Sequence, residues 1–258
     1  MKQFIKLEVI NLQIISKIVY CNFMVLKPLL KTFQRTVYIL NYLFSTQLNE
    51  TKFYRKYLFD KEVIVFDIGS NLGTFSQQLS KTFPKKLLEI HSFEPIDELL
   101  AIQKIKNGTL HKHNYVISEK SGLIDFFEHE ISSQSSVMLN DKIKNQKVKK
   151  LTKEAITLEQ ALEKTNISKV DLLKLDTEGN EFDILKSSEH LLKQKIFKII
   201  KVEVSFFINN KFTDKNFHLI NALMHSNGYV YTGHSNVHYQ DNKILFFDSF
   251  YINNNLLS

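Results

Sequence analysis

From residue 61 to the end of the sequence, short apolar runs rich in β-branched residues alternate with stretches that have the apolar spacing of helices. Strands and helices that alternate in this way form βαβ units and a mostly parallel sheet. The first run, Val63–Phe66, is continuous in its apolar character, which is typical of a strand buried on both faces. The pattern therefore predicts one α/β domain over residues 61–258.

The runs place the expected elements along the chain. Strands are expected at Val63–Phe66, Leu88–Phe93, His111–Ile117, Val170–Leu175 and Ile199–Val204, with a last hairpin from Tyr229–Thr232 and Leu245–Tyr251. Helices are expected over Thr74–Thr82, Ile96–Asn107, Glu181–Leu192 and Phe217–Asn227. Ligands of open parallel sheets bind beyond the carboxyl ends of the strands, so the chemistry is expected at these strand ends.

Residues 1–60 have apolar residues spaced three to four apart, interrupted at Pro28. This spacing predicts an N-terminal helical extension packed on the main domain, with an interfacial membrane helix or an oligomer surface as the alternative. Lys17 divides the apolar residues of the first 26 positions, and no small-residue cleavage site follows them. The segment therefore does not favour a spanning helix or a secretory signal, and a signal anchor stays open as an alternative. We expect a cytoplasmic protein, with peripheral contact to the inner face of the membrane as the alternative.

The composition limits the class of partner. The formal net charge is +7, but the 34 basic residues include just two arginines, Arg35 and Arg55. Because arginine is the usual bidentate reader of phosphates and bases, this excess of lysine argues against a nucleic-acid partner. A lysine run in an expected loop indicates either a solvated surface or attraction of an acidic acceptor or an anionic membrane; it comprises Lys142, Lys144, Lys147, Lys149, Lys150 and Lys153. The single Cys21 excludes an intrachain disulfide and a cysteine zinc site.

The first strand ends in an Asp-x-Gly-x-x-x-Gly turn formed by Asp67, Gly69 and Gly73. The dinucleotide fingerprint and the phosphate-binding loop are both absent here, and Asp67 would repel phosphates, so the turn favours a cationic or ammonium-bearing ligand. Glu94 ends the second strand, where an acid is placed to bind the two hydroxyls of a ribose. We expect Glu94→Ala to weaken cofactor binding with little loss of stability, because an acid at a strand end is partly solvated.

Two acids, Asp176 and Glu178, follow the strand Val170–Leu175. Because buried carboxylates are costly unless they bind something, they are candidates for the active site. The alternative is that Thr177 or Asp176 caps the next helix. Glu203 lies inside an apolar run and is a further candidate, with an edge-strand salt bridge as its alternative.

Taken in order, these motifs resemble the FkbM family of S-adenosylmethionine-dependent methyltransferases. The resemblance covers about Val63 to Val204. It rests on Phe66–Gly73, Phe93-Glu94-Pro95, Asn114–Ser118 before Gly122, Ser135-Ser136, Ile156-Thr157-Leu158, Leu173–Glu181 and Val202-Glu203. It implies a Rossmann-like class I methyltransferase fold with a seven-stranded sheet flanked by helices. It also implies S-adenosylmethionine as the cofactor and methyl transfer to a hydroxyl oxygen of a sugar, glycan or natural product, as in polysaccharide modification.

The resemblance also implies roles for residues. The turn residues Asp67, Gly69, Ser70, Asn71 and Gly73 would hold the methionine half of the cofactor, Glu94 the ribose, and Val116 and Ile117 the adenine.

An alcohol is a poor nucleophile, so a general base is expected, with Asp176 as the candidate and Glu178 and Glu203 as helpers. A divalent metal held by such acids, or a base among His129, His225 and His234, is the alternative; no residue is assigned as a metal ligand. An RNA methyltransferase and a non-catalytic cofactor-binding module stay open as other functions. The acceptor and the oligomeric state are not specified by the sequence.

Overall fold

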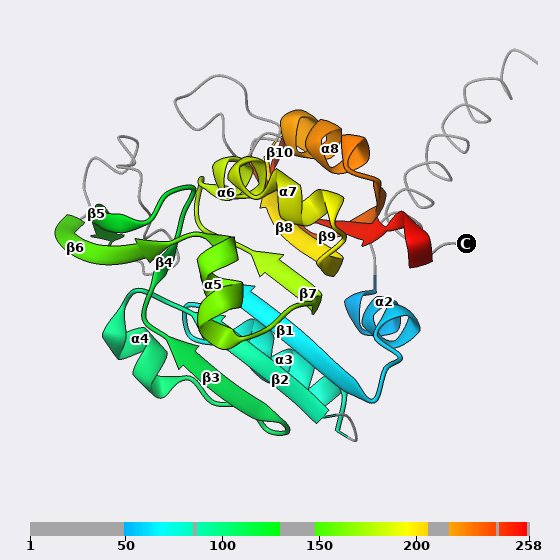
Figure 1. The fold of residues 1–258 in the computed structure, drawn as a ribbon, viewed down its shortest axis with the longest axis horizontal. Helices are drawn as coiled ribbons and strands as arrows, with labels where there is room; N and C mark the ends of the chain where they lie inside the picture. The colour runs from blue at the N-terminus through cyan, green and yellow to red at the C-terminus, as the bar shows by residue number, and fades with distance from the viewer. Residues whose placement is uncertain (1–48, 85–86, 130–147, 206–216, 241–242, 257–258) are drawn as a thin grey trace, which may run out of the picture. The chain divides into compact units, whose positions relative to one another are not determined.

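The computed structural model describes residues 49–84, 87–129, 148–205, 217–240 and 243–256 of the chain. Its main feature is a seven-stranded sheet in the order β3-β2-β1-β7-β8-β10-β9 (Figure 1). These strands are β1 (Glu62–Ile68), β2 (Leu87–Phe93), β3 (Thr109–His113), β7 (Val170–Leu175), β8 (Phe197–Val204), β9 (Tyr229–Gln240) and β10 (Lys243–Asn253). The helices are α2 (Glu50–Tyr57), α3 (Thr74–Thr82), α4 (Asp97–Ile102), α5 (Leu158–Thr165), α6 (Glu181–Ser187), α7 (Glu189–Lys193), α8 (Phe217–Ser226) and the 3-10 helix η2 (Asn254–Leu256).

The sheet is parallel except at β10, which runs antiparallel to both β8 and β9. The chain starts at β1 in the middle, extends through β2 to β3 at one edge, and then crosses to β7 on the other side of β1. This reversal between β1 and β7 is a topological switch point, where open α/β sheets form their ligand crevice. The expected Rossmann-like fold of class I methyltransferases, with seven strands in a mostly parallel sheet, is confirmed.

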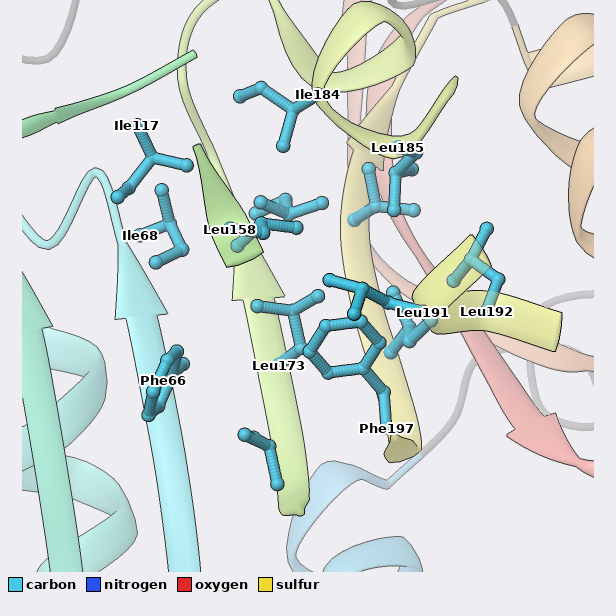
Figure 2. Close-up of a cluster of buried hydrophobic side chains, with 14 of the residues drawn as sticks. Phe66, Ile68, Ile117, Leu158, Leu173, Ile184, Leu185, Leu191, Leu192 and Phe197 are labelled. Atoms are coloured by element: carbon cyan, nitrogen blue, oxygen red, sulfur yellow. The ribbon is translucent and has the colours of Figure 1, made fainter. Parts of the chain in front are cut away.

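Both faces of the sheet are covered, which explains the continuous apolar runs. Along β1, Phe66 and Ile68 belong to one buried cluster, and Val63 and Val65 belong to the other. Figure 2 shows the first cluster, in which Phe66, Leu173 and Phe197 of the strands are surrounded by apolar side chains of α5, α6 and α7. Burial of each such side chain contributes about 1.5–3 kcal/mol. In the second cluster, side chains of helices α2 and α3 pack against the strands.

Helix α2 lies within the segment predicted as an N-terminal extension, and it packs on the sheet. The ring of Phe53 meets that of Phe250 edge-on at 5.1 Å. The buried ammonium of Lys201 binds both Glu50 of this helix, at 3.1 Å, and Asp248 of β10, at 2.9 Å. The division at residue 60 and the rest of the extension stay predictions, because residues 1–48 lie outside the described part. Within the described ranges, no helix is long and apolar enough to cross a membrane.

Three predicted elements differ in the structure: two are divided and one is shorter. The strand expected over His111–Ile117 breaks after β3, and β4 (Val116–Ile117) joins a second sheet. The side chain of Asn114 accounts for the break, since it donates to the carbonyls of Glu94 and Pro95. The predicted helix Ile96–Asn107 ends at residue 102, and the one over Glu181–Leu192 is interrupted at Ser188.

The second sheet has the order β4-β6-β5 and was not predicted. Strands β5 (Gly122–His129) and β6 (Val148–Ile156) pair antiparallel. The expectation of a loop for the whole lysine run is therefore wrong for Lys149, Lys150 and Lys153, which lie in β6 and pair with Glu128, Asp125 and Asp97. The earlier lysines of the run lie outside the described residues.

Helix α5, which was also not predicted, begins with a capping box. The Thr157 hydroxyl accepts from the amide of Gln160 at 3.2 Å, and the Gln160 side chain accepts from the amide of Thr157 at 3.1 Å. We expect Thr157→Ala to lower the free energy of unfolding by about 0.5–2 kcal/mol, measured by urea denaturation. Thr157→Ser keeps the hydroxyl and should lose much less. Equal losses in the two variants would show that the methyl group, and not the cap, is responsible.

Candidate active site

A cavity lies at the carboxyl ends of β1, β2 and β7, beside the switch point. It encloses about 640 Å³ of space, part of which is open to solvent at the mouth of the cavity. Its lining consists of Ile68, Gly69, Asn71, Phe93, Glu94, Pro95, Tyr115, Val116, Ile117, Phe126, Asp176, Thr177, Glu178 and Asn180. Gly69, Asn71, Glu94, Val116, Ile117, Asp176 and Glu178, all predicted from the sequence, are therefore brought together here.

The turn after β1 is held very close to the end of β7. Gly69 has φ +69°, and a Cβ at this position would lie 1.9 Å from the backbone oxygen of Asp176. The amides of Gly69 and Ser70 both donate to the carbonyl of Phe93, at 3.1 and 3.2 Å. The turn is thus fixed from two sides, and glycine is required by both the φ angle and the contact.

Glu94 connects this turn to the end of β2. One of its carboxylate oxygens accepts from the amide of Asn71 at 2.8 Å, and the other accepts from the amide of Ile96 at 3.0 Å. The residue is 5% exposed, and burial raises the pKa of Glu94 above its ordinary value. The expectation that this acid is partly solvated is therefore wrong. Because a carboxylate has about four acceptor positions, Glu94 keeps capacity for two hydroxyl donors on the cavity side.

Asp67 has a different place from the one expected. It is fully buried, accepts from the hydroxyl of Ser76 at 2.7 Å, and pairs with the ammonium of Lys174 at 3.1 Å. It is absent from the cavity lining. Its negative charge is compensated by a cation of the protein, so the inference that Asp67 suits a cationic ligand loses its basis. Asp67 therefore stabilises the turn through Ser76 and Lys174.

Ser70 and Gly73 also lie behind the turn and not on the cavity. The hydroxyl of Ser70 accepts from Ser92 at 2.6 Å and from the amide of Gln103 at 2.9 Å. The same Gln103 amide donates to the carbonyl of Asn71 at 2.6 Å. A Cβ on Gly73 would meet the Gln103 side chain at 3.0 Å, so this glycine admits the buried Gln103. Gln103 is a support that sequence reasoning missed.

Two carboxylates, Asp176 and Glu178, stand at the cavity after β7. The Asp176 carboxylate lies 3.4 Å from the ammonium of Lys174, with its side chain 34% exposed. Glu178 has a left-handed backbone, φ +59°. The buried Glu181 holds this loop by accepting from the amides of Thr177, at 2.7 Å, and Gly179, at 3.1 Å. Strain of this kind is stored at functional sites when the surroundings fix it.

The helix-cap alternative for these residues is wrong. The N-cap of α6 is Asn180, which makes no capping hydrogen bond with its side chain. The hydroxyl of Thr177 donates instead to the carboxylate of Glu181 at 3.1 Å. Glu203 lies in β8, between β7 and β10, so it is not on an edge strand. One carboxylate oxygen each from Asp176, Glu178 and Glu203 lie within 4.8 Å of one another, although Glu203 is not part of the cavity lining.

An apolar wall completes the cavity. Val116 and Ile117, the residues predicted to flank the adenine, come from β4, and Phe126 comes from the unpredicted β5. Tyr115, which lies in the break between β3 and β4, also lines the cavity. Of the histidines considered as bases, His225 and His234 are not among the lining residues: His225 lies in the last turn of α8, and His234 bonds the Tyr231 hydroxyl at 2.9 Å. The side chain of His129 lies outside the described part.

Comparison with known proteins identifies the family to which the chain belongs. A family model described as the methyltransferase FkbM domain matches residues 67–231. Over 147 residues the chain is 25% identical to the hexuronic acid methyltransferase AglP of Haloferax volcanii, and the match covers 55% of this chain and 57% of that protein. The chain thus spans little more than half the length of this curated relative.

Two solved structures give the scale of the structural likeness. Methyltransferase FkbM from Methylobacillus flagellatus KT aligns with a TM-score of 0.49 and 14% identity, over 82% of this chain and 50% of that one. The magnesium protoporphyrin IX methyltransferase ChlM of Synechocystis PCC 6803 with bound SAH aligns with a TM-score of 0.43 and 9% identity, over 78% and 79%.

Gly69 gives a test of the close approach between β1 and β7. We expect Gly69→Ala to destabilise the protein by at least about 1–3 kcal/mol in urea unfolding, because the new methyl group overlaps a backbone atom that cannot move aside. Gly122→Ala is the matched control, since Gly122 also has a positive φ, +127°, but a Cβ added there would meet no atom within 4 Å beyond its chain neighbours. Equal losses would mean that the φ angle alone is responsible.

Glu94 gives a second test. In Glu94→Gln, an amide group faces one of the two backbone amides now bound, so that two donors oppose each other. We expect the free energy of unfolding to fall by about 1–3 kcal/mol. Calorimetry should show at least an approximately tenfold loss in affinity for S-adenosylmethionine. Glu98→Gln, on the exposed side of α4, should change neither quantity. An unchanged affinity in Glu94→Gln would contradict the assignment of this residue to the ribose.

Proposed function

Because the chain belongs to the FkbM methyltransferase family, we propose that it transfers the methyl group of S-adenosylmethionine to a hydroxyl oxygen of a sugar, glycan or related small molecule. The observation that carries this proposal is the cavity itself. It joins a glycine turn, a buried carboxylate with spare acceptor positions and an apolar wall to a pair of carboxylates on its other side.

The cavity residues fit the parts of this cofactor. Glu94 would accept from the ribose hydroxyls, and the apolar side chains of Val116, Ile117 and Phe126 would flank the adenine. The turn at Gly69 and Asn71 would hold the methionine half, with its backbone approaching closely because Gly69 lacks a side chain. The carboxyl ends of β1 and β2 therefore contribute binding, and the end of β7 is left for the acceptor.

Asp176 is the residue we assign to the acceptor hydroxyl. When bound, the cofactor supplies a methyl group that its sulfonium already activates, so the protein has mainly to position the acceptor and remove its proton. The carboxylate of Asp176 would take that proton as the oxygen–methyl bond forms. Glu178 and Glu203, whose oxygens lie near that of Asp176, would assist in orienting the hydroxyl.

The acceptor class follows from the relative and from the composition. The name of the related Haloferax volcanii protein indicates methylation of a hexuronic acid, and we propose an acceptor of similar chemistry, a sugar or glycan, for this chain. The scarcity of arginine speaks against RNA as the acceptor. A non-catalytic cofactor-binding module would not need the carboxylates that stand after β7 on the side of the cavity left for an acceptor. The cytoplasmic location, and contact of the N-terminal segment with membrane or partner, stay predictions.

The experiment that tests the proposal has two arms. Calorimetry should detect binding of S-adenosylmethionine and not of NAD. Transfer of labelled methyl should then be measured on uronic acid glycosides, neutral glycosides and transfer RNA. Turnover on a glycoside supports the proposal, and turnover confined to the RNA contradicts it. Binding of the cofactor without turnover on any acceptor favours the non-catalytic module.

Asp176 gives a further prediction. We expect Asp176→Asn to lower turnover about 10²–10⁴-fold, because it keeps the shape of the side chain but removes the base. The affinity for S-adenosylmethionine should change less than about tenfold, because other strand ends hold the cofactor. Asp125→Asn, on the exposed face of β5, is the matched control and should leave turnover unchanged.

Two results would change the role of Asp176. Normal turnover in a folded Asp176→Asn protein would show that it is not the base. Loss of wild-type turnover on addition of a chelator would favour the alternative in which the carboxylates hold a divalent ion that orients the hydroxyl.

A further inference from the structure

A second group of chemically active side chains lies on strands β2 and β3, apart from the cavity. Glu89 and His91 are two residues apart on β2 and therefore point to the same face of the sheet. His111 is the direct partner of His91 on the neighbouring β3. None of the three belongs to the cavity lining, and the proposed methyl transfer uses none of them.

Potential ligand atoms of the three side chains lie close together. Nε2 of His91 lies 3.1 Å from Oε1 of Glu89, and Nε2 of His111 lies 3.4 Å from that same oxygen. One donor atom from each residue lies within 4.8 Å of the others. Ligands at the usual 2.0–2.1 Å from a tetrahedral ion are separated by roughly 3.3 Å, so two of the three separations already match.

The surroundings fix the orientation of the buried ligand. His91 has a side chain 4% exposed, and its second ring nitrogen, Nδ1, lies 3.0 Å from Nε2 of His113. Metal-binding histidines nearly always use the ring nitrogen that faces away from the ion in a hydrogen bond that fixes the ring, and here the imidazole of His113 provides the partner. The ring of His91 is nearly coplanar with that of His113, as the edge-to-edge contact of their nitrogens requires. The ring of His111 lies nearly parallel to that of His91, with the centroids 4.7 Å apart, so the exposed His111 side chain has to rotate for both Nε2 atoms to point at one ion.

The other two ligands leave the site accessible. The side chains of Glu89 and His111 are 42% and 43% exposed, so an ion can enter from solvent and keep water in its remaining positions. Two imidazoles and one carboxylate form a donor set for zinc and similar divalent transition metals, and they are a poor set for magnesium or calcium.

We propose that Glu89, His91 and His111 form a binding site for one zinc-like divalent transition-metal ion. The ion links β2 to the edge strand β3. Glu94 follows β2 directly, and Tyr115 and Val116 follow β3, so the bound ion stiffens the two strands that lead into the cofactor cavity. The ion itself takes no part in the methyl-transfer step proposed above.

The test uses the full chain with any affinity tag removed. Titration with ZnCl₂ against a chromophoric chelator should give one ion bound through this site, and CoCl₂ should give visible absorption bands of a site with nitrogen and oxygen ligands. ZnCl₂ should also raise the temperature of thermal unfolding, because an ion that binds the folded state stabilises it. His111→Ala and Glu89→Gln each remove one exposed ligand, and each should weaken binding at least about tenfold.

Two control variants separate this site from others in the chain. His190→Ala disrupts an exposed histidine–glutamate pair that has no third ligand among the residues the structure describes, and Asp176→Asn alters the carboxylates at the cavity. Both should bind the ion as the wild type does. The proposal is overturned if the wild type binds zinc more weakly than about 1 mM, or if the affinity persists in His111→Ala and Glu89→Gln. It is equally overturned if Asp176→Asn is the variant that loses the ion.

Discussion

The architecture of the candidate active site depends on one buried ammonium group, that of Lys174. Its nitrogen lies 3.1 Å from the carboxylate of Asp67, 3.2 Å from the carbonyl of Gly69 and 3.4 Å from the carboxylate of Asp176. Burial acts to lower the pKa of Lys174, but the carboxylates of Asp67 and Asp176 outweigh it and hold the pKa above its usual value. Because removing one partner of a buried pair leaves an uncompensated charge, these contacts fix the ends of β1 and β7 together.

Two buried carboxylates do the same for the neighbouring turns. Glu94 accepts from one backbone amide in the turn after β1 and from another in the segment after β2. Glu181 accepts from backbone amides of the loop after β7. In each case a charge that would be costly in the interior is compensated by backbone donors that the turn would otherwise leave unpaired. The cavity is thus rigid before any ligand enters, which is the condition for precise positioning of a cofactor and an acceptor.

The sequence predicts the parallel sheet well because both faces are buried, so the strands are continuous apolar runs. It also predicts which strand ends meet, since that follows from topology. It does not predict β5 and β6, because a largely exposed antiparallel pair carries weak periodicity and the lysines of β6 resemble a solvated loop. It also misses α5, whose eight residues give a short apolar pattern. Nor does it distinguish residues that face the cavity from those that support it. Ser70 and Gly73 stand in the same motif as Asn71, yet they contact Gln103, whose position depends on where α4 ends.

The acidic residues of the motifs differ in how far hydrogen-bond donors and cations of the protein itself compensate their negative charge. Asp67 is fully buried and is compensated by Lys174 and Ser76, so it stabilises the turn. Glu94 binds two backbone amides and retains acceptor positions, which suits a residue that binds neutral hydroxyls. Asp176 touches the same ammonium as Asp67, yet a third of its side chain is open to solvent, so a proton from an acceptor can reach it. Three carboxylates at adjoining strand ends thus differ in role because the surrounding donors differ, and a motif that records residue type alone does not carry that distinction.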